Sequence, residues 1–177
     1  VMNPITPHLS EEINNGDELI SAAAWPTVSE EKISLQADAG EELIRTAMEG
    51  MRNVLKLAKL GKAKKFTLFV AEKWLYDLYT ILSHEINVTR NVGEILRKVL
   101  ENVELKPKGK EISKIVIGVV KDVSKLPSIV TYQAAELAVI KEAKEFLERE
   151  FDCSIEIIIG EESDHSKAKQ AMPGKVG

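Results

Sequence analysis

The chain has 177 residues, of which 44% are hydrophobic and 29% are charged, a composition that suits one compact globular domain with a short additional segment. No apolar run approaches the roughly 20 residues that a membrane-spanning helix needs, and the first residues lack the basic and apolar regions of a signal peptide, so we expect a cytoplasmic protein with no membrane partner. The formal net charge of -4 argues against a nucleic-acid partner when taken as a total, but most of the acidic excess precedes Asp38, and the remainder is close to neutral with local basic runs.

The first predicted element is a short helix that begins at Pro7, because proline is preset for the first helical position and the preceding Thr6 can act as a cap. The segment Asn14–Asp17 stops this helix, and Trp25–Pro26 is typical of a connector. A segment this short cannot bury its own apolar residues. We therefore predict that 1–37 is the end of a larger helical body.

The remaining elements alternate between helices and strands. A capping-box pattern at Asp38 opens the clearest helix, which Gly61 stops. The pattern then predicts a strand over 66–71, helices over 74–82, 92–103, 112–126 and 131–150, and a second strand over 154–159. The run 112–126 is rich in β-branched residues, but its spacing and length favour a helix. For 38–177 we predict an α/β fold in which a small, short-stranded sheet packs with several helices.

No motif for catalysis is present: the chain has no phosphate loop, dinucleotide fingerprint, His-Glu-x-x-His or nucleophile elbow. The three histidines, His8, His84 and His165, lie far apart, and Cys153 alone cannot form an internal disulfide or a cysteine-based zinc site. The segment Ser163–Ser166 contains residue types used in hydrolysis, but a solvated loop is the favoured interpretation. We expect no catalytic residue, no metal site and no cofactor in this chain.

Basic residues are the candidates for ligand binding. They form three clusters, namely Arg52, Lys56, Lys59, Lys62, Lys64 and Lys65, then Lys106, Lys108 and Lys110, then Lys167, Lys169 and Lys175. The first cluster has no intervening acid, and Arg52, Lys56 and Lys59 are expected to share a helical face. Because the helix dipole also favours cations at a carboxy-terminus, phosphate contact and plain solvation both remain open for this cluster. Each cluster alone is expected to be ordinary surface, but together the three favour an RNA partner.

Two stretches resemble known proteins. The stretch from Met2 to Ile13 (MNPITPHLSEEI) resembles a motif in the helical anticodon-binding domain of the class I aminoacyl-tRNA synthetases for leucine, isoleucine, valine and methionine, in which a connector ending in Trp-Pro commonly follows. The remainder, up to the tail Ala171–Lys175, resembles the α/β carboxy-terminal domain of archaeal and related eukaryotic leucyl-tRNA synthetases.

The resemblance implies that 1–37 is the end of the anticodon-binding helical domain with its connector, and that 38–177 is a carboxy-terminal tRNA-binding domain. It implies a role in recognising tRNA(Leu) through its long variable arm, for leucine attachment in translation. The enzyme would be an ATP-dependent leucine–tRNA ligase, with ATP and Mg²⁺ at its catalytic domain and the rest of the synthetase chain as a further partner. In that family the chain continues a few residues into a strand that meets the arm, so we expect Lys167–Gly177 to be mobile or poorly packed here.

Two alternatives remain open. An appended domain of another class I synthetase would share the Pro-x-x-Pro-His pattern but recognise a different tRNA, and tRNAs with and without a long variable arm would separate these cases. A protein-interaction module would instead dock its apolar helical faces on a partner and use its lysines only for solubility. Association with a protein that is insensitive to salt would favour that second alternative.

Overall fold

The computed structural model describes residues 4–14, 16, 18–25, 27, 29–30, 33–163 and 165–177. The chain divides into two compact units, Val1–Ser34 and Leu35–Gly177. The parts of the sequence predictions that involve Met2, Asn3, Asn15, Asp17, Pro26 and Asp164 lie outside the described residues. No helix within the described ranges combines the length and the apolar character needed to cross a membrane.

The first unit contains the helix α1 (Pro7–Ile13), which begins at the predicted proline, and a short 3-10 helix (Ile20–Ala22). The carboxylate of Glu11 joins them, because it accepts hydrogen bonds from the backbone N–H groups of Ile20 and Ser21, both at 2.9 Å. These bonds, that from Ser21 first, lower the pKa of Glu11. None of the described residues of this unit is buried, so its apolar side chains have no core of their own, as the short length predicted.

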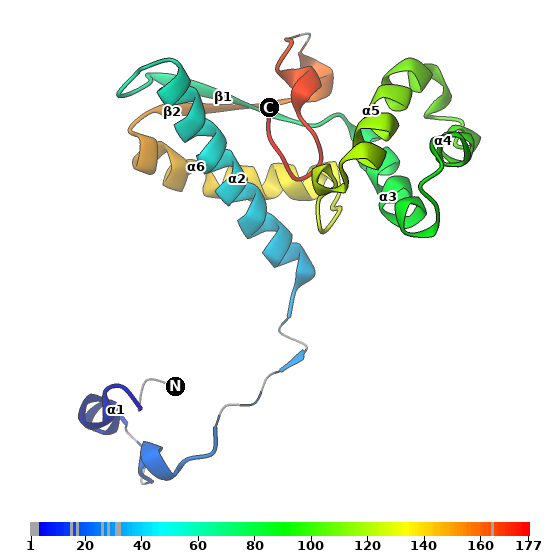
Figure 1. Ribbon diagram of the computed structural model, residues 1–177. Coiled ribbons are helices and arrows are strands. Elements are labelled where there is room, and N and C mark those ends of the chain that lie inside the picture. The colour runs from blue at the N-terminus through cyan, green and yellow to red at the C-terminus, as the bar shows by residue number, and fades with distance from the viewer. Residues whose placement is uncertain are drawn as a thin grey trace. The chain divides into compact units, whose positions relative to one another are not determined.

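The second unit has the predicted α/β composition, and Figure 1 shows its elements. In chain order they are α2 (Leu35–Leu57), β1 (Lys65–Val70), α3 (Lys73–Val88), α4 (Val92–Glu101), α5 (Gly109–Lys121), α6 (Gln133–Phe151) and β2 (Ser154–Ile159). Short 3-10 helices cover Lys106–Lys108, Val123–Lys125, Gly160–Glu162 and Ala168–Gln170. The run 112–126 is helical up to Lys121, as its spacing predicted. Helix α2 begins three residues before Asp38, which therefore lies in the first turn instead of capping it.

The two strands pair in parallel, with a register that runs from Lys65 opposite Ser154 to Val70 opposite Ile159. Parallel strands require a long crossover, which the segment from α3 to α6 provides. Successive side chains of a strand point to opposite faces of the sheet. As a result, the sheet contributes to two hydrophobic cores, one on each face.

One core lies between α2, α6 and one face of the sheet, where Leu68 and Ile155 are buried. Its helical members include Leu43, Met51, Ile140 and Leu147. The other core lies among α3, α4 and α5, which group together in Figure 1, and it receives Phe69 from the opposite face of the sheet. Its members include Leu78, Tyr79, Leu82, Ile95, Val99, Ile112 and Val116. These two cores fix the positions of α2 and β1, which carry Arg52, Lys56 and Lys65 of the first basic cluster.

The tail that follows β2 packs against the helices α3 to α5 and against β1. Ala168 and Ala171 are buried in the core formed by α3, α4 and α5. Gly177 exchanges two backbone hydrogen bonds with Phe69, its N–H donating at 3.0 Å and its carbonyl accepting at 3.3 Å. The expectation that Lys167–Gly177 is poorly packed is therefore wrong. Small side chains fit the core there, and the exposed edge of β1 supplies hydrogen-bond partners.

Candidate nucleic-acid interface

The first basic cluster begins on α2, but the helix ends before the cluster does. The N–H of Leu60 donates to the carbonyl of Leu55 (3.0 Å) and the N–H of Lys59 to that of Lys56 (3.1 Å), the pattern of a Schellman motif. Lys59 occupies its left-handed position, with a φ of 53°, where glycine is usual. The prediction of a shared helical face is thus wrong for Lys59, because the chain leaves the helix after Leu57.

The apparent absence of acids in this cluster holds along the sequence but not in space. Carboxylates at the end of α6 and in β2 lie beside several of its cations. The ion pairs are Arg52–Glu150 (3.0 Å), Lys62–Asp152 (2.6 Å) and Lys65–Glu156 (3.1 Å). The hydrogen bond between Lys62 and Asp152 raises the pKa of the lysine and lowers that of the carboxylate. All these side chains are at least 43% exposed, so the pairs can exchange with phosphate at little cost in stability.

Other members of the first cluster keep their charge unpaired. Within the described ranges, no carboxylate lies within 4.0 Å of the ammonium groups of Lys56, Lys59 or Lys64. Exposed, unpaired ammonium groups are the simplest contacts for phosphate oxygens. These lysines therefore fit best with the RNA contact predicted for the cluster, a prediction that the structure by itself does not test.

The second cluster surrounds the start of α5. The Lys108 ammonium lies 5.4 Å from the centre of the Trp74 ring, 3.6 Å from the Glu72 carboxylate and 3.8 Å from that of Glu111. Lys106 and Lys110, by contrast, have no carboxylate partner in the part of the chain that is described.

The third cluster lies in the tail, and the structure brings part of it next to the second. Lys169 and Lys108 line the same cavity of about 720 Å³, together with Trp74. Lys167 donates to the side-chain oxygen of Gln170 (3.1 Å). The two clusters are separate in the sequence, but one lysine of each lines this cavity.

Lys175, the last member of the third cluster, belongs to a tight turn in the tail. Its backbone pairs with that of Met172. Pro173 and Gly174 form the corner, and Gly174 has a φ of 77°, as a type II turn requires.

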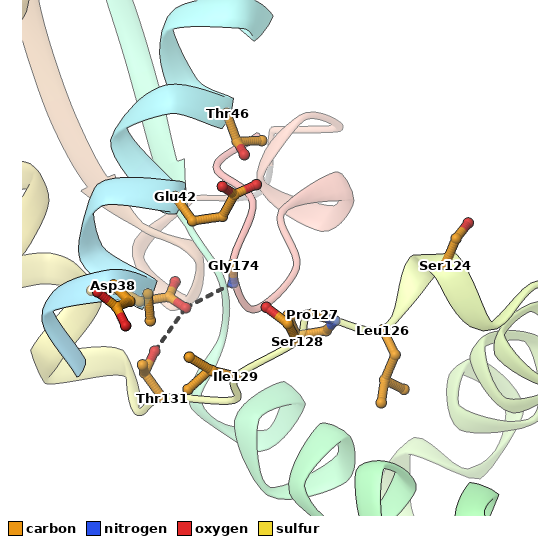
Figure 2. Close-up of a pocket in the computed structure, with 12 residues that line it drawn as sticks. Asp38, Glu42, Thr46, Ser124, Leu126, Pro127, Ser128, Ile129, Thr131 and Gly174 are labelled. Atoms are coloured by element: carbon orange, nitrogen blue, oxygen red, sulfur yellow. Dashed lines mark hydrogen bonds between the residues drawn. The ribbon is translucent and has the colours of Figure 1, made fainter. Parts of the chain in front are cut away.

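A buried carboxylate holds this turn in place. Glu136 of α6 accepts hydrogen bonds from the Tyr76 hydroxyl (2.6 Å), the Thr131 hydroxyl (3.0 Å) and the Gly174 N–H (2.7 Å). Figure 2 shows the last two as dashed lines from the labelled Thr131 and Gly174. Burial raises the pKa of Glu136, and it also raises the pKa of Tyr76, with a smaller contribution from the carboxylate. Sequence reasoning missed this residue, because a glutamate within a helical pattern looks like ordinary surface.

The cavity in Figure 2 does not suit an anion. It has a volume of about 390 Å³, and the carboxylates of Asp38, Glu42 and Glu136 lie around it. Among the described residues, no group of three or more His, Cys, Asp or Glu side chains is arranged to hold a metal ion. We therefore assign this region a structural role in fixing the tail.

Sequence reasoning also missed two lysines of α6. Lys141 and Lys144 line a groove of about 490 Å³ together with Lys65 and the strand segment 154–157. Their spacing of three residues within a predicted helix placed them on one face. The proximity of that face to Lys65 depends on the pairing of β1 with β2, which connects residues far apart in the sequence.

Comparison with known proteins defines the class. Residues 1–117, which span the first unit and part of the second, match the family described as the anticodon-binding domain of tRNA ligase, and the chain belongs to this family. The chain is similar to the leucine–tRNA ligases of Methanococcus vannielii (35% identity over 180 residues), Pyrococcus furiosus (32% over 179) and Methanocaldococcus jannaschii (32% over 178). Each match covers 99% of this chain and 18% of the relative. The resemblance to archaeal leucyl-tRNA synthetases that the sequence indicated is confirmed.

Proposed function

We propose that this chain is the carboxy-terminal tRNA-binding region of an ATP-dependent leucine–tRNA ligase, and that it helps to recognise tRNA(Leu) through the long variable arm. The observation that carries the proposal is the similarity to leucine–tRNA ligases over 99% of the chain, combined with the match to a tRNA-ligase anticodon-binding family. The chain spans about 18% of the length of those relatives, so the catalytic steps are assigned to parts of the enzyme outside it.

The distribution of charge supports an RNA ligand. Exposed lysines such as Lys56, Lys59 and Lys64 lie at the end of α2 and in the connection to β1, without carboxylate partners in the described part of the chain. Proteins recognise duplex RNA mainly through its backbone and shape, and reserve base contacts for loops and tips. A rigid α/β unit with cations at the ends of its elements suits recognition of a projecting arm.

The exposed apolar residues of the first unit support a second contact, with the rest of the synthetase chain. Leu9, Ile13 and Trp25 are 51%, 68% and 70% exposed, although such side chains are normally covered in a folded domain. In the proposal, 1–37 completes a helical anticodon-binding domain that covers these side chains, and 38–177 forms the appended tRNA-binding domain.

Cofactors and location follow from the same proposal. ATP and Mg²⁺ would bind at the catalytic domain of the enzyme, and this chain would carry no cofactor of its own. The enzyme would work in the cytoplasm, where leucine is attached to tRNA for protein synthesis. The purified chain should accordingly show no leucine-dependent exchange of pyrophosphate into ATP. Exchange above background would contradict the assignment of catalysis to parts of the enzyme outside this chain.

The test of RNA recognition is a gel-shift comparison of two tRNAs. The chain should bind a tRNA(Leu) transcript more tightly than an elongator tRNA with a short variable arm. Equal affinities would favour an appended domain of another class I synthetase. Association with protein only, insensitive to salt, would instead favour the protein-interaction module.

A further inference from the structure

The groove beside the outer edge of β2, which Lys65, Lys141 and Lys144 line, contains hydrogen-bond donors that the sequence did not predict to lie together. The N–H of Ser154 donates to the carbonyl of Lys64 (3.1 Å), so this residue faces β1. Backbone groups of a strand alternate between its two edges, which directs the N–H groups of Ile155 and Ile157 outward. The N–H of Ile155 is taken by the carboxylate of Glu148 (2.8 Å). The N–H of Ile157 therefore points into a groove that Lys141 and Lys144 also line.

The lysines of this groove differ in how firmly they are paired. Lys141 is exposed and has no carboxylate within 4.0 Å among the described residues. Lys144 lies 3.9 Å from Glu148, at the limit of an ion pair, and that carboxylate is already engaged by the strand. Lys65 is paired with Glu156 at 3.1 Å, and both side chains remain about half exposed.

These positions extend the first basic cluster around the edge of the sheet. Lys65 is a member of that cluster and also lines the groove, so the lysines of α6 continue the same surface. Three lysines and an outward backbone N–H that line one groove supply hydrogen-bond donors for the oxygen atoms of a phosphodiester backbone. An acidic peptide is a weaker match. Glu148 and Glu156 would repel its carboxylates, and a peptide lacks the regularly repeated negative charge with which RNA would offset that repulsion.

We propose that the groove formed by Lys65, Lys141, Lys144 and the β2 segment 154–157 binds the phosphate backbone of the tRNA. The inference rests on the proposed function, since it names the surface through which the same RNA is held. It assigns Lys141 and Lys144 to RNA binding, although the chain as a whole has a net charge of -4.

The test compares two double substitutions in the full chain, with a tRNA(Leu) transcript as the probe. K141A/K144A should lower affinity roughly tenfold near 0.1 M salt and reduce the slope of log affinity against log salt by about 1.4 to 1.8, as expected for two lost phosphate contacts. The matched control is K121A/K125A. Lys121 is exposed without a carboxylate partner in the described ranges, and Lys125 lies 4.0 Å from Asp122, but neither lines the groove. The control should change affinity less than about twofold.

A substitution that is expected to raise affinity complements this test. Glu156→Gln removes a competing carboxylate but keeps an acceptor for the Thr67 hydroxyl, which lies 3.4 Å away. It should raise affinity for the same transcript. If K141A/K144A binds like the unsubstituted chain, or loses no more than the control, the groove is not an RNA site, while the proposed function stands. If the unsubstituted chain binds no tRNA, both proposals are wrong.

Discussion

The ammonium group of Lys62 lies 2.6 Å from the carboxylate of Asp152, a residue 90 positions away in the sequence. This contact joins the turn after α2 to the residue that ends α6, where Asp152 adopts a left-handed φ of 48°. A cation predicted to meet RNA is thus already paired in the free protein. Since both side chains are more than 70% exposed, the pair contributes little to the stability of the fold.

Removal of the acid should therefore improve RNA binding. Asp152→Asn retains a residue that tolerates the left-handed conformation and releases Lys62. We expect a few-fold gain in affinity for tRNA and a salt slope steeper by up to about one. Glu150→Gln, which releases Arg52, is the comparison on the same surface. If neither substitution changes the slope, these cations do not touch RNA.

Lys59 allows charge and backbone effects to be separated. Both Lys59→Gly and Lys59→Ala remove one cation, so both should weaken RNA binding equally. Only glycine suits the positive φ, and the alanine variant should be less stable than the glycine variant by about 1 kcal/mol. Urea unfolding of the two variants measures this difference. Equal stabilities would show that the helix ends elsewhere in solution.

Glu136 should make stability depend on pH in a defined direction. Its folded pKa is raised above 4.5, so the unfolded chain loses this proton at a lower pH than the folded protein does. The stabilising contribution of Glu136 to the free energy of unfolding is fully present below about pH 4.5, and it is lost as pH rises through the folded pKa. Glu136→Gln keeps an acceptor for Thr131 and Gly174 but cannot ionise. The variant should therefore not show this loss of stability as pH rises.

The measurement is the urea midpoint of the wild-type chain and of the Glu136→Gln variant between pH 4 and pH 8. Glu142→Gln, at an exposed position of the same helix, is the control. The difference between wild type and Glu136→Gln should grow in favour of the variant as pH rises. A difference that does not vary with pH would mean that Glu136 titrates normally.

Gly174 and Gly118 should respond in opposite ways to alanine. Gly174 has a positive φ, and a Cβ there would lie 3.1 Å from Pro127, so Gly174→Ala should destabilise the protein by roughly 1 to 2 kcal/mol. Gly118 lies within α5 with no atom within 4 Å of an added Cβ, so Gly118→Ala should stabilise it by about 0.5 to 1 kcal/mol. Thermal unfolding gives both values, and a neutral Gly174→Ala would argue against the turn.

Local patterns predicted the elements well, because they depend on spacing within a single segment. The strand at 154–159 and the helical nature of 112–121 follow from the run of apolar residues and its period. The start of α2 was placed too late, because Asp38 is as acceptable within a first turn as at a cap.

The features that were missed all depend on contacts between distant segments. No local pattern indicates that Glu136 meets Gly174, or that Gly177 pairs with Phe69. The same holds for Lys141 beside Lys65, which requires the parallel pairing of two strands separated by a long crossover. Charge patterns along the chain therefore indicated basic clusters, but not the lysines that α6 adds to the proposed interface.

The most direct test of the proposed function moves the variable arm between two tRNAs and measures the affinity of the chain for each. Four transcripts are needed: tRNA(Leu), the same tRNA with its arm shortened, a short-arm elongator tRNA, and that tRNA carrying the arm of tRNA(Leu). We predict that affinity follows the arm, so that shortening weakens binding and transplantation restores it. Affinity that follows the tRNA body regardless of the arm would contradict the account.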